Sequence, residues 1–341
     1  MTSAPPNIWH RLLQSRLIWP LAGVALLLLF NFLFDRTFFE LSTRDGNLYG
    51  PMVTVLRLSV KVMLLATGMT LVIATGGVDL SVGSVMAIVG ALIGFLAEQG
   101  HVAFPGLLGA AFGAAILIGA FSGVLVSYVG IQPIVATLIM MVLGRGIALG
   151  ITGGIPLRVA DAGVLFLGRG FLAGVPVPIV LVLAIFAATA LACRKTALGL
   201  FVEAVGDNET ASRLSGVNAR GIKLLVYIFC ALCAAFASLV TIGDVGRVEP
   251  DSLGQMLELD AITAVVVGGT VLTGGRFTLA GSLIGALLIQ TLTMTLIREG
   301  MPSDVAPVPK ALVITVVCLL QSPRMRTQLG SIFSFGKGEA T

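Results

Sequence analysis

Charged side chains are scarce in this sequence. Only 11% of the 341 residues are Asp, Glu, Lys or Arg and 57% are hydrophobic, whereas roughly a quarter of a soluble domain is charged. No polar stretch separates two cores, so the length does not indicate two soluble domains. The composition predicts an all-α integral membrane protein with one membrane domain of about ten transmembrane helices.

Histidine and cysteine are also rare, which argues against a metal centre. His10 and His101 are isolated, and the four cysteines fall within or at the edges of apolar stretches. Cys230-x-x-Cys233 is the only motif-like spacing, and inside hydrocarbon we interpret it as small apolar packing rather than a redox or metal pair. The sequence therefore predicts no metal site and no cofactor.

A nucleic-acid surface is missing too. The formal net charge is +4, but no run of Lys or Arg with interleaved aromatic residues is present. Membrane orientation explains the excess, because positively charged loops stay in the cytoplasm. With an N-terminus inside, Lys and Arg gather in the predicted cytoplasmic segments. We therefore expect both termini in the cytoplasm, the lipid bilayer as a partner and no nucleic acid.

A phosphate-binding loop is the next absence. No lysine fits the pattern G-x-x-x-x-G-K-S/T, so a primary pump built on this chain takes its energy from an ATPase on another polypeptide. A membrane-embedded enzyme would need His, Cys or acidic residues clustered at one depth of the membrane, and the sequence shows no such cluster. A secondary carrier coupled to a proton or sodium gradient is the alternative that the missing loop allows.

Uncharged stretches predict the spanning helices, since a span needs about 20 apolar residues. The first, 17–34, is expected to be an uncleaved helix. Stretch 102–144 is too long for one helix, and the turn residues at 130–133 divide it into a helix ending near Tyr128 and another from Pro133 to about Thr152. We expect a cytoplasmic segment at 1–16, the membrane domain at 17–322 and a cytoplasmic tail at 323–341.

The longest predicted cytoplasmic loop, 194–220, is the most polar internal segment. It carries the signals of a short helix, with Asn208 as N-cap, Glu209 in the first turn and Gly216 where a left-handed residue is needed. Asn218 is expected to cap the helix that re-enters the membrane. An ordinary solvated loop is the alternative.

Two glycine-rich segments, 75–83 and 268–275, interrupt apolar stretches. Both indicate broken or closely packed helices, where freed backbone groups can line a polar path. Ionisable residues within spans need a partner, a polar cavity or access to the interface. Arg57 and Lys61, four residues apart on one helix face, are expected to reach the outer interface. Inside the bundle, the expected charge pairs join Asp79 or Asp260 to Arg145 or Lys310.

Four ordered blocks resemble the permeases of ribose/galactose-type bacterial ABC sugar importers. They are GMTLVIATGGVDLSVGSVMAIVGA at 68–91, IQPIVATLIMMVLGRGIALGITGG at 131–154, TALGLFVEAVGDNETASRLSGVN at 196–218 and LDAITAVVVGGTVLTGGRFTLAGSLIGALLIQ at 259–290. The resemblance covers 48–321. Within this family, the segments ATGGVDLSVG, RKTALG and LELDAI most resemble the galactofuranose importer permeases. The sequence departs from the family pattern at 207–210 and in the outer loop 243–255.

The resemblance implies a permease of the bacterial inner membrane that imports a monosaccharide, galactofuranose or a related aldose. It implies a second permease, identical or different, two cytoplasmic ATPase domains and a periplasmic sugar-binding protein. It places the coupling helix at 203–216, with ATPase-coupling candidates Glu203, Ala204, Gly206, Asn208, Ala211, Ser212 and Gly216. Because a sugar needs hydroxyl-compatible donors and acceptors, the candidate lining groups of its path are Asp79, Ser81, Ser84, Thr137, Thr263, Thr270 and Gln290. For a single Ser or Thr, bonding to its own helix backbone is the alternative.

Overall fold

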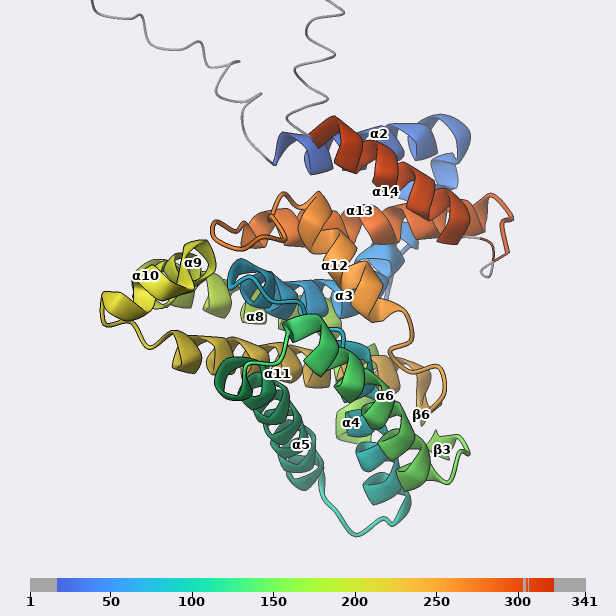
Figure 1. The fold of residues 1–341 in the computed structure, drawn as a ribbon. Coiled ribbons are helices and arrows are strands. Elements are labelled where there is room, and N and C mark those ends of the chain that lie inside the picture. Colours follow the sequence, from blue (N-terminus) through green and yellow to red (C-terminus); the bar gives the residue numbers. More distant parts are fainter. Residues whose placement is uncertain (1–16, 303–304, 306, 322–341) are drawn as a thin grey trace, which may run out of the picture.

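The computed structural model of the chain describes residues 17–302, 305 and 307–321. The predicted cytoplasmic segments at 1–16 and 323–341 lie outside these residues. The described chain is mostly helical (Figure 1), and six of its helices are long and apolar enough to cross a membrane. They are α3 (Pro51–Ala74), α5 with η2 (Phe104–Val129), α6 (Pro133–Thr152), α8 (Val177–Lys195), α11 (Ala219–Val245) and α13 (Leu279–Arg298). The predicted helical membrane fold is thereby confirmed.

Two shorter apolar helices, α2 and α4, and two further short helices, α12 and α14, accompany these six in the described residues. Helices α2 (Ile18–Phe34) and α4 (Val82–Glu98) have 17 residues each, α14 (Pro307–Gln321) has 15 and α12 (Leu257–Val267) has 11. At 1.5 Å per residue, α12 reaches only about 16 Å, roughly half of a bilayer core. The predicted number of ten spans stays a prediction.

The division of stretch 102–144 is confirmed. Helix α5 (Phe104–Val124) continues into a wider π-helical turn, η2 (Leu125–Val129). The chain then turns at Gly130, whose φ of +85° lies in the left-handed region that glycine adopts without penalty. Pro133 opens α6 because the first turn of a helix does not need its N–H group.

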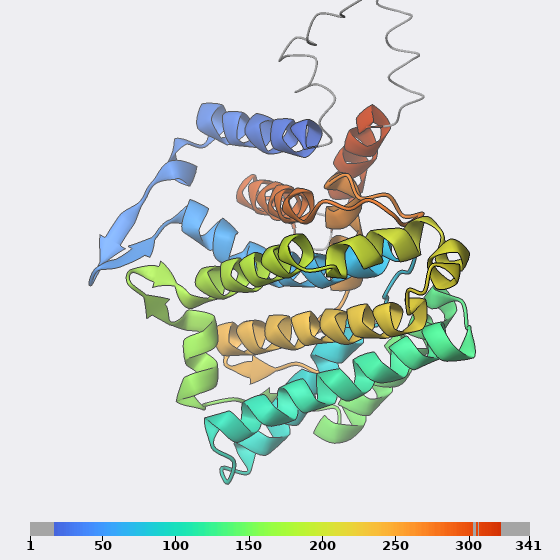
Figure 2. The same cartoon turned by 90° about the vertical axis from the view of Figure 1, so that its left-hand side faces the viewer.

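The bundle has two distinct ends (Figures 1 and 2). One end carries α9 (Leu198–Asp207) and α10 (Glu209–Leu214). The opposite end carries η1 (Arg36–Phe39), α7 (Ala162–Arg169) and three short antiparallel strand pairs. The strand pairs are β1 (Ser42–Arg44) with β2 (Asn47–Tyr49), β3 (Leu157–Arg158) with β6 (Arg247–Val248), and β4 (Phe171–Leu172) with β5 (Val175–Pro176). We call these the α9–α10 end and the strand end.

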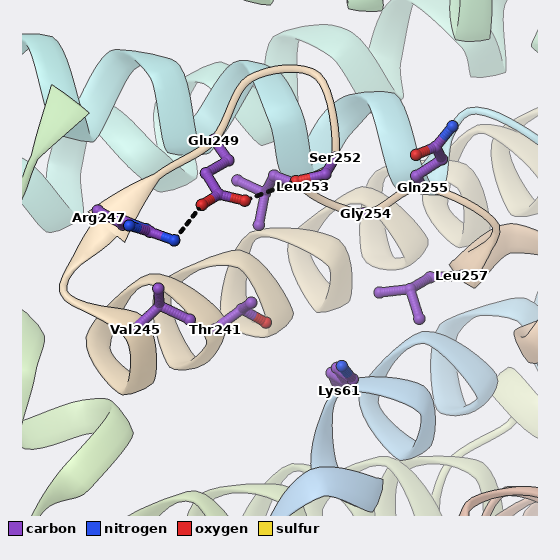
Figure 3. Close-up of a pocket in the computed structure, with 10 residues that line it drawn as sticks. All are labelled: Lys61, Thr241, Val245, Arg247, Glu249, Ser252, Leu253, Gly254, Gln255 and Leu257. Atoms are coloured by element: carbon purple, nitrogen blue, oxygen red, sulfur yellow. Dashed lines mark hydrogen bonds and ion pairs between the residues drawn. The ribbon is translucent and has the colours of Figure 1, made fainter. Parts of the chain in front are cut away.

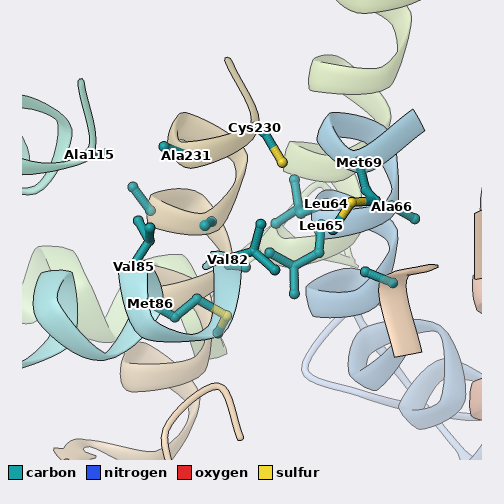
Figure 4. Close-up of a cluster of buried hydrophobic side chains, with 14 of the residues drawn as sticks. Leu64, Leu65, Ala66, Met69, Val82, Val85, Met86, Ala115, Cys230 and Ala231 are labelled. Atoms are coloured by element: carbon teal, nitrogen blue, oxygen red, sulfur yellow. The ribbon is translucent and has the colours of Figure 1, made fainter. Parts of the chain in front are cut away.

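Helix α3 forms the centre of the core and packs against α8, α11, α12 and α13 through buried side chains. Figure 4 shows Leu64 and Leu65 of α3 beside Val82 of α4, with Cys230 of α11 close to them. Cys230 and Cys233 are buried free thiols in this core, which matches their interpretation as small packing residues. Small residues let membrane helices approach closely, since lipid supplies little hydrophobic drive for helix association.

Candidate functional site

The predicted loop 194–220 is a folded helix pair rather than a solvated loop. Asn208 separates α9 from α10, and its side-chain oxygen accepts a hydrogen bond from the N–H of Ala211 at 2.9 Å. Gly216 has a φ of +84°, as its left-handed position requires. Asn218 accepts from the N–H of Gly221 at 3.0 Å and begins α11. All three predicted helix-boundary residues are confirmed.

An ion-pair cluster fastens α10 to α11. Glu209 pairs with Arg213 one turn along α10 and with Lys223 of α11, whose Nζ lies 2.5 Å from the carboxylate. Partial burial raises the pKa of Glu209, but hydrogen bonds and charge from Lys223 and Arg213 outweigh this effect and hold the pKa below its ordinary value near 4.5. The carboxylate is therefore ionised at neutral pH, and α10 is tied to a membrane-length helix.

The seven coupling candidates divide into two groups. Asn208, Ala211 and Gly216 are exposed at the α9–α10 end, whereas Ser212 is buried. The others, Glu203, Ala204 and Gly206, lie on α9 and are partly buried. Gly206 points into the bundle, because a β-carbon on it would overlap the carbonyl oxygen of Ala74 and the amide nitrogen of Gly275.

Both glycine-rich segments meet α9 at this point, in a contact that we call the glycine junction (Ala74, Gly76, Gly206, Gly274 and Gly275). The N–H of Gly275 donates to the carbonyl oxygen of Ala74 at 2.9 Å. A β-carbon on Gly274 would lie 2.8 Å from the oxygen of Gly206 and 2.9 Å from the nitrogen of Gly76. The interruptions thus serve close backbone packing here, and α9 touches the ends of α3 and of the loop that follows α12.

At the strand end, the chain re-enters the bundle between α11 and α12. Val248 packs on Gly94 near the end of α4, and Gly254 packs on Gly83 near its start. The two glycines are eleven positions apart on the helix, so the segment descends about 16 Å alongside α4. Non-helical backbone at membrane depth is tolerated where protein buries it or where it lines a polar cavity. We call 248–256 the re-entrant segment.

A partly buried arginine and a buried glutamate lie against the re-entrant segment. Arg145 of α6 donates from Nη1 to the carbonyl oxygen of Leu253 at 2.5 Å. Glu258, in the first turn of α12, is 8% exposed, and its Oε2 has no hydrogen-bond partner among the described residues. A β-carbon on Gly83 would meet both this oxygen and the Arg145 guanidinium. Met256, directly before α12, takes a φ of +63°, which few non-glycine residues adopt.

The ionisable residues of the spans find partners only partly as predicted. Lys310 lies 2.6 Å from Asp260, one of the predicted pairs. Asp79 instead accepts hydrogen bonds from the N–H and the hydroxyl of Ser81. Arg57 forms an ion pair with Asp244 of α11 at 3.3 Å and so does not depend on the interface alone.

Two cavities of about 170 Å³ each, with polar groups in their walls, lie between α3 and α11, and the re-entrant segment lines the first of them. Figure 3 shows the first, where Lys61 of α3 faces a wall formed by α11 and the segment that follows it. Its polar lining groups are Lys61, Thr241, Arg247, Glu249, Ser252 and Gln255. The second contains Arg57 and Asp244, and it shares Lys61, Thr241 and Val245 with the first. We call the two together the outer cavity, after the side of the membrane on which the predicted orientation puts the strand end.

The seven predicted path residues lie elsewhere. Asp79, Ser81, Ser84 and Thr137 are buried together where α4 begins and faces α6. Most of these hydroxyls donate to backbone carbonyls, including Ser84 to Ser81 at 2.8 Å and Thr137 to Pro133 at 2.9 Å. On the other helices, Thr263 of α12 and Gln290 of α13 are partly buried, and Thr270 is buried in the loop after α12. The outer cavity draws instead on Arg57 and Lys61 of α3, which the sequence assigned to the outer interface, and on loop 243–255, where the family resemblance is weakest.

A bundle of membrane-length helices with a docked helix pair at one end and a polar cavity near the other is a membrane transport subunit. Residues 52–320 match the family described as branched-chain amino acid transport system / permease component. The chain belongs to this family of ABC transporter permeases, subunits of the bacterial inner membrane that have no ATPase of their own.

Named relatives cover most of the chain. The galactofuranose transporter permease protein of Escherichia coli is 41% identical over 95% of this chain and 96% of the relative. The fructose import permease protein of Bifidobacterium longum is 40% identical over 94% and 91%. The ribose import permease protein of Escherichia coli is 39% identical over 76% and 82%. No solved structure matches the chain.

Proposed function

We propose that the chain carries a monosaccharide, galactofuranose or a related aldose, through the bacterial inner membrane. The family description names branched-chain amino acids, but the three relatives above are named for sugars and two of them align over nearly the whole chain. The mixed donors and acceptors of the outer cavity suit a polyhydroxylated ligand. The partners are a cytoplasmic ABC ATPase, a periplasmic sugar-binding protein and a second permease, identical or different.

The glycine junction is the observation that carries the coupling mechanism. The α9–α10 end faces the cytoplasm in this proposal, so the ATPase docks on the exposed Asn208, Ala211 and Gly216. Gly206 and its neighbours on α9 pass the movement inward, since Gly206 has no free space against Ala74 and Gly275. Packed interfaces respond to small shifts by switching between discrete arrangements.

Helix α12 connects the two sites. The loop after its C-terminal end reaches the glycine junction, and its N-terminal end continues from the re-entrant segment that lines the outer cavity. It packs closely on α13, because a β-carbon on Gly281 would overlap the carbonyl oxygen of Gly268 and one on Gly285 that of Ala264. A shift of α9 therefore moves α12 and α13 together. This movement opens the cavity to one side of the membrane and then to the other.

Reconstitution tests this function. In liposomes with its ATPase and binding protein, the chain should accumulate sugar when ATP is supplied; alone, it should neither hydrolyse ATP nor accumulate sugar. Gradient-driven accumulation by the chain alone would instead establish the ion-coupled carrier.

Two variants of α10 test the docking site. Ala211→Asp adds a charge to the exposed face, and Gly216→Val strains a left-handed position by about 1–2 kcal/mol. Both should lower ATPase co-purification and transport while leaving membrane insertion intact, and Thr210→Ser on the same helix should change neither. Wild-type transport and ATPase retention in both variants would refute docking at α10.

A further inference from the structure

Lys61 differs from the other charged residues of the outer cavity in its pairing. The cavity is lined by two other basic residues and two acids, and these form two ion pairs: Arg247 with Glu249 at 2.6 Å and Arg57 with Asp244 at 3.3 Å. Lys61 lines both halves of the cavity, and its side-chain ammonium group has no ion pair or hydrogen bond within residues 17–302, 305 and 307–321. Its cavity is thus left with one unpaired ammonium group.

The nearest additional acid does not change this. Asp260 lies close enough to Lys61 to influence it electrostatically, but its carboxylate is held by Lys310 at 2.6 Å. An ammonium group has three N–H donors and no acceptor, and leaving such a group partly buried without a partner is costly. A ligand that offers oxygen acceptors to Lys61 would remove this cost.

The other polar groups indicate which oxygen-bearing ligand fits. Ser252 donates to Glu249 at 3.0 Å, and the carboxylate and the Gln255 amide keep further capacity to accept hydrogen bonds. A ligand hydroxyl can accept a hydrogen bond from Lys61 and donate one to such acceptors. Figure 3 shows Lys61 on one side of the cavity and Glu249, Ser252 and Gln255 on the other. An anionic ligand would be attracted to Lys61 but would also meet the Glu249 carboxylate, so the lining favours a neutral polyol.

We propose that Lys61 binds the transported sugar, donating hydrogen bonds to its hydroxyl or ring oxygens within the outer cavity. This inference rests on the proposed function and assigns to it a substrate-contacting residue. Lys61 lies on α3, whose last residue, Ala74, belongs to the glycine junction. At 1.5 Å per residue the two lie about 20 Å apart on one helix, so the sugar site and the coupling element share a rigid connection.

The complete transporter with its ATPase and loaded binding protein provides the test. In liposomes, uptake of radiolabelled D-galactose, D-fructose and D-ribose is measured together with ATP hydrolysis, and the result is the number of ATP molecules hydrolysed per sugar imported. Lys61→Met keeps the length of the side chain but removes its donors, Lys61→Arg keeps donors, and Arg36→Met removes an exposed positive charge that does not line the cavity.

We expect Lys61→Met to raise the ATP-to-sugar ratio at least tenfold, because the transporter would cycle without retaining its ligand. Lys61→Arg should stay within threefold of wild type, and Arg36→Met should not change the ratio. A purely structural lysine would lower uptake and hydrolysis together, so an unchanged ratio in Lys61→Met overturns the inference.

Assembly failure is also decisive. If Lys61→Met and the smaller Lys61→Gln both fail to assemble while Lys61→Arg assembles, the charge serves folding and the inference is wrong. If the wild-type transporter imports none of the three sugars, the proposed function itself fails.

Discussion

The N–H of Gly275 donates a hydrogen bond to the carbonyl oxygen of Ala74, which places the loop after α12 against the last turn of α3. Gly206 of α9 fits against the same two groups without room for a β-carbon. The contact joins three segments that are far apart in the sequence. Through this contact, the backbone of α9 touches α3, which lines the outer cavity, and the loop after α12.

Gly206→Ala should therefore impair coupling. The added methyl group overlaps backbone rather than a flexible side chain, and overpacking of this kind costs about 1–3 kcal/mol. We expect ATP-driven uptake to fall at least fivefold and the thermal midpoint of the complex to decrease. Gly150→Ala on α6, which has open space around it, is the matched control and should behave as wild type. Equal uptake by the two variants would show that α9 tolerates a shift away from the junction.

The Glu209 cluster predicts a pH dependence of α10 docking. The pKa of Glu209 is lower in the folded protein than its ordinary value near 4.5. The stability that the Glu209 carboxylate contributes is therefore complete above pH 4.5 and is lost as the pH falls through the pKa of the folded state. Amide exchange in 209–214, corrected for the intrinsic effect of pH, should show less protection at pH 4 than at pH 7. Lys223→Gln should reduce that difference, and an unaltered difference would mean that another group titrates.

Arg145 should matter through the re-entrant segment. Arg145→Met removes the donor to the Leu253 carbonyl and leaves Glu258 without the nearby cation. A buried polar group that loses its partner costs about 1–3 kcal/mol, so we expect a lower thermal midpoint and slower uptake. The double variant Arg145→Met with Glu258→Gln should recover part of the stability, since both charges are then absent. Purely additive losses in a double-mutant cycle would refute the interaction.

Orientation can be read with two single cysteines in a cysteine-free background. Ser215 follows α10 and Ala160 lies between β3 and α7 at the strand end, and both residues are exposed. An impermeant thiol reagent should label Ser215→Cys only from the cytoplasm and Ala160→Cys only from the periplasm. The reverse pattern would invert the membrane orientation proposed for the ATPase docking site.

Local features of this protein could be predicted because neighbouring residues determine them. Asn208 and Asn218 satisfy N–H groups only three residues away, and Gly216 needs nothing more than freedom to adopt a positive φ. The break at Gly130 and Pro133 follows from the same short-range chemistry. Composition and these signals were sufficient for a helical membrane protein with a structured loop at 194–220, and the resemblance of four sequence blocks to sugar permeases supplied the transport role.

The tertiary structure alone decided which side chains form a cavity and which helices touch. The sequence showed that Asp260 and Lys310 were candidates for pairing. It did not show that Asp79 would accept hydrogen bonds from Ser81, or that the Lys61 side chain would have no partner in the part of the chain that the structure describes. Lipid-facing and protein-facing surfaces of these helices are both apolar, so the polar-apolar periodicity that orients a helix in water is weak. Helix orientation then depends on close packing between distant segments, as at Gly206, and only the folded chain brings those segments together.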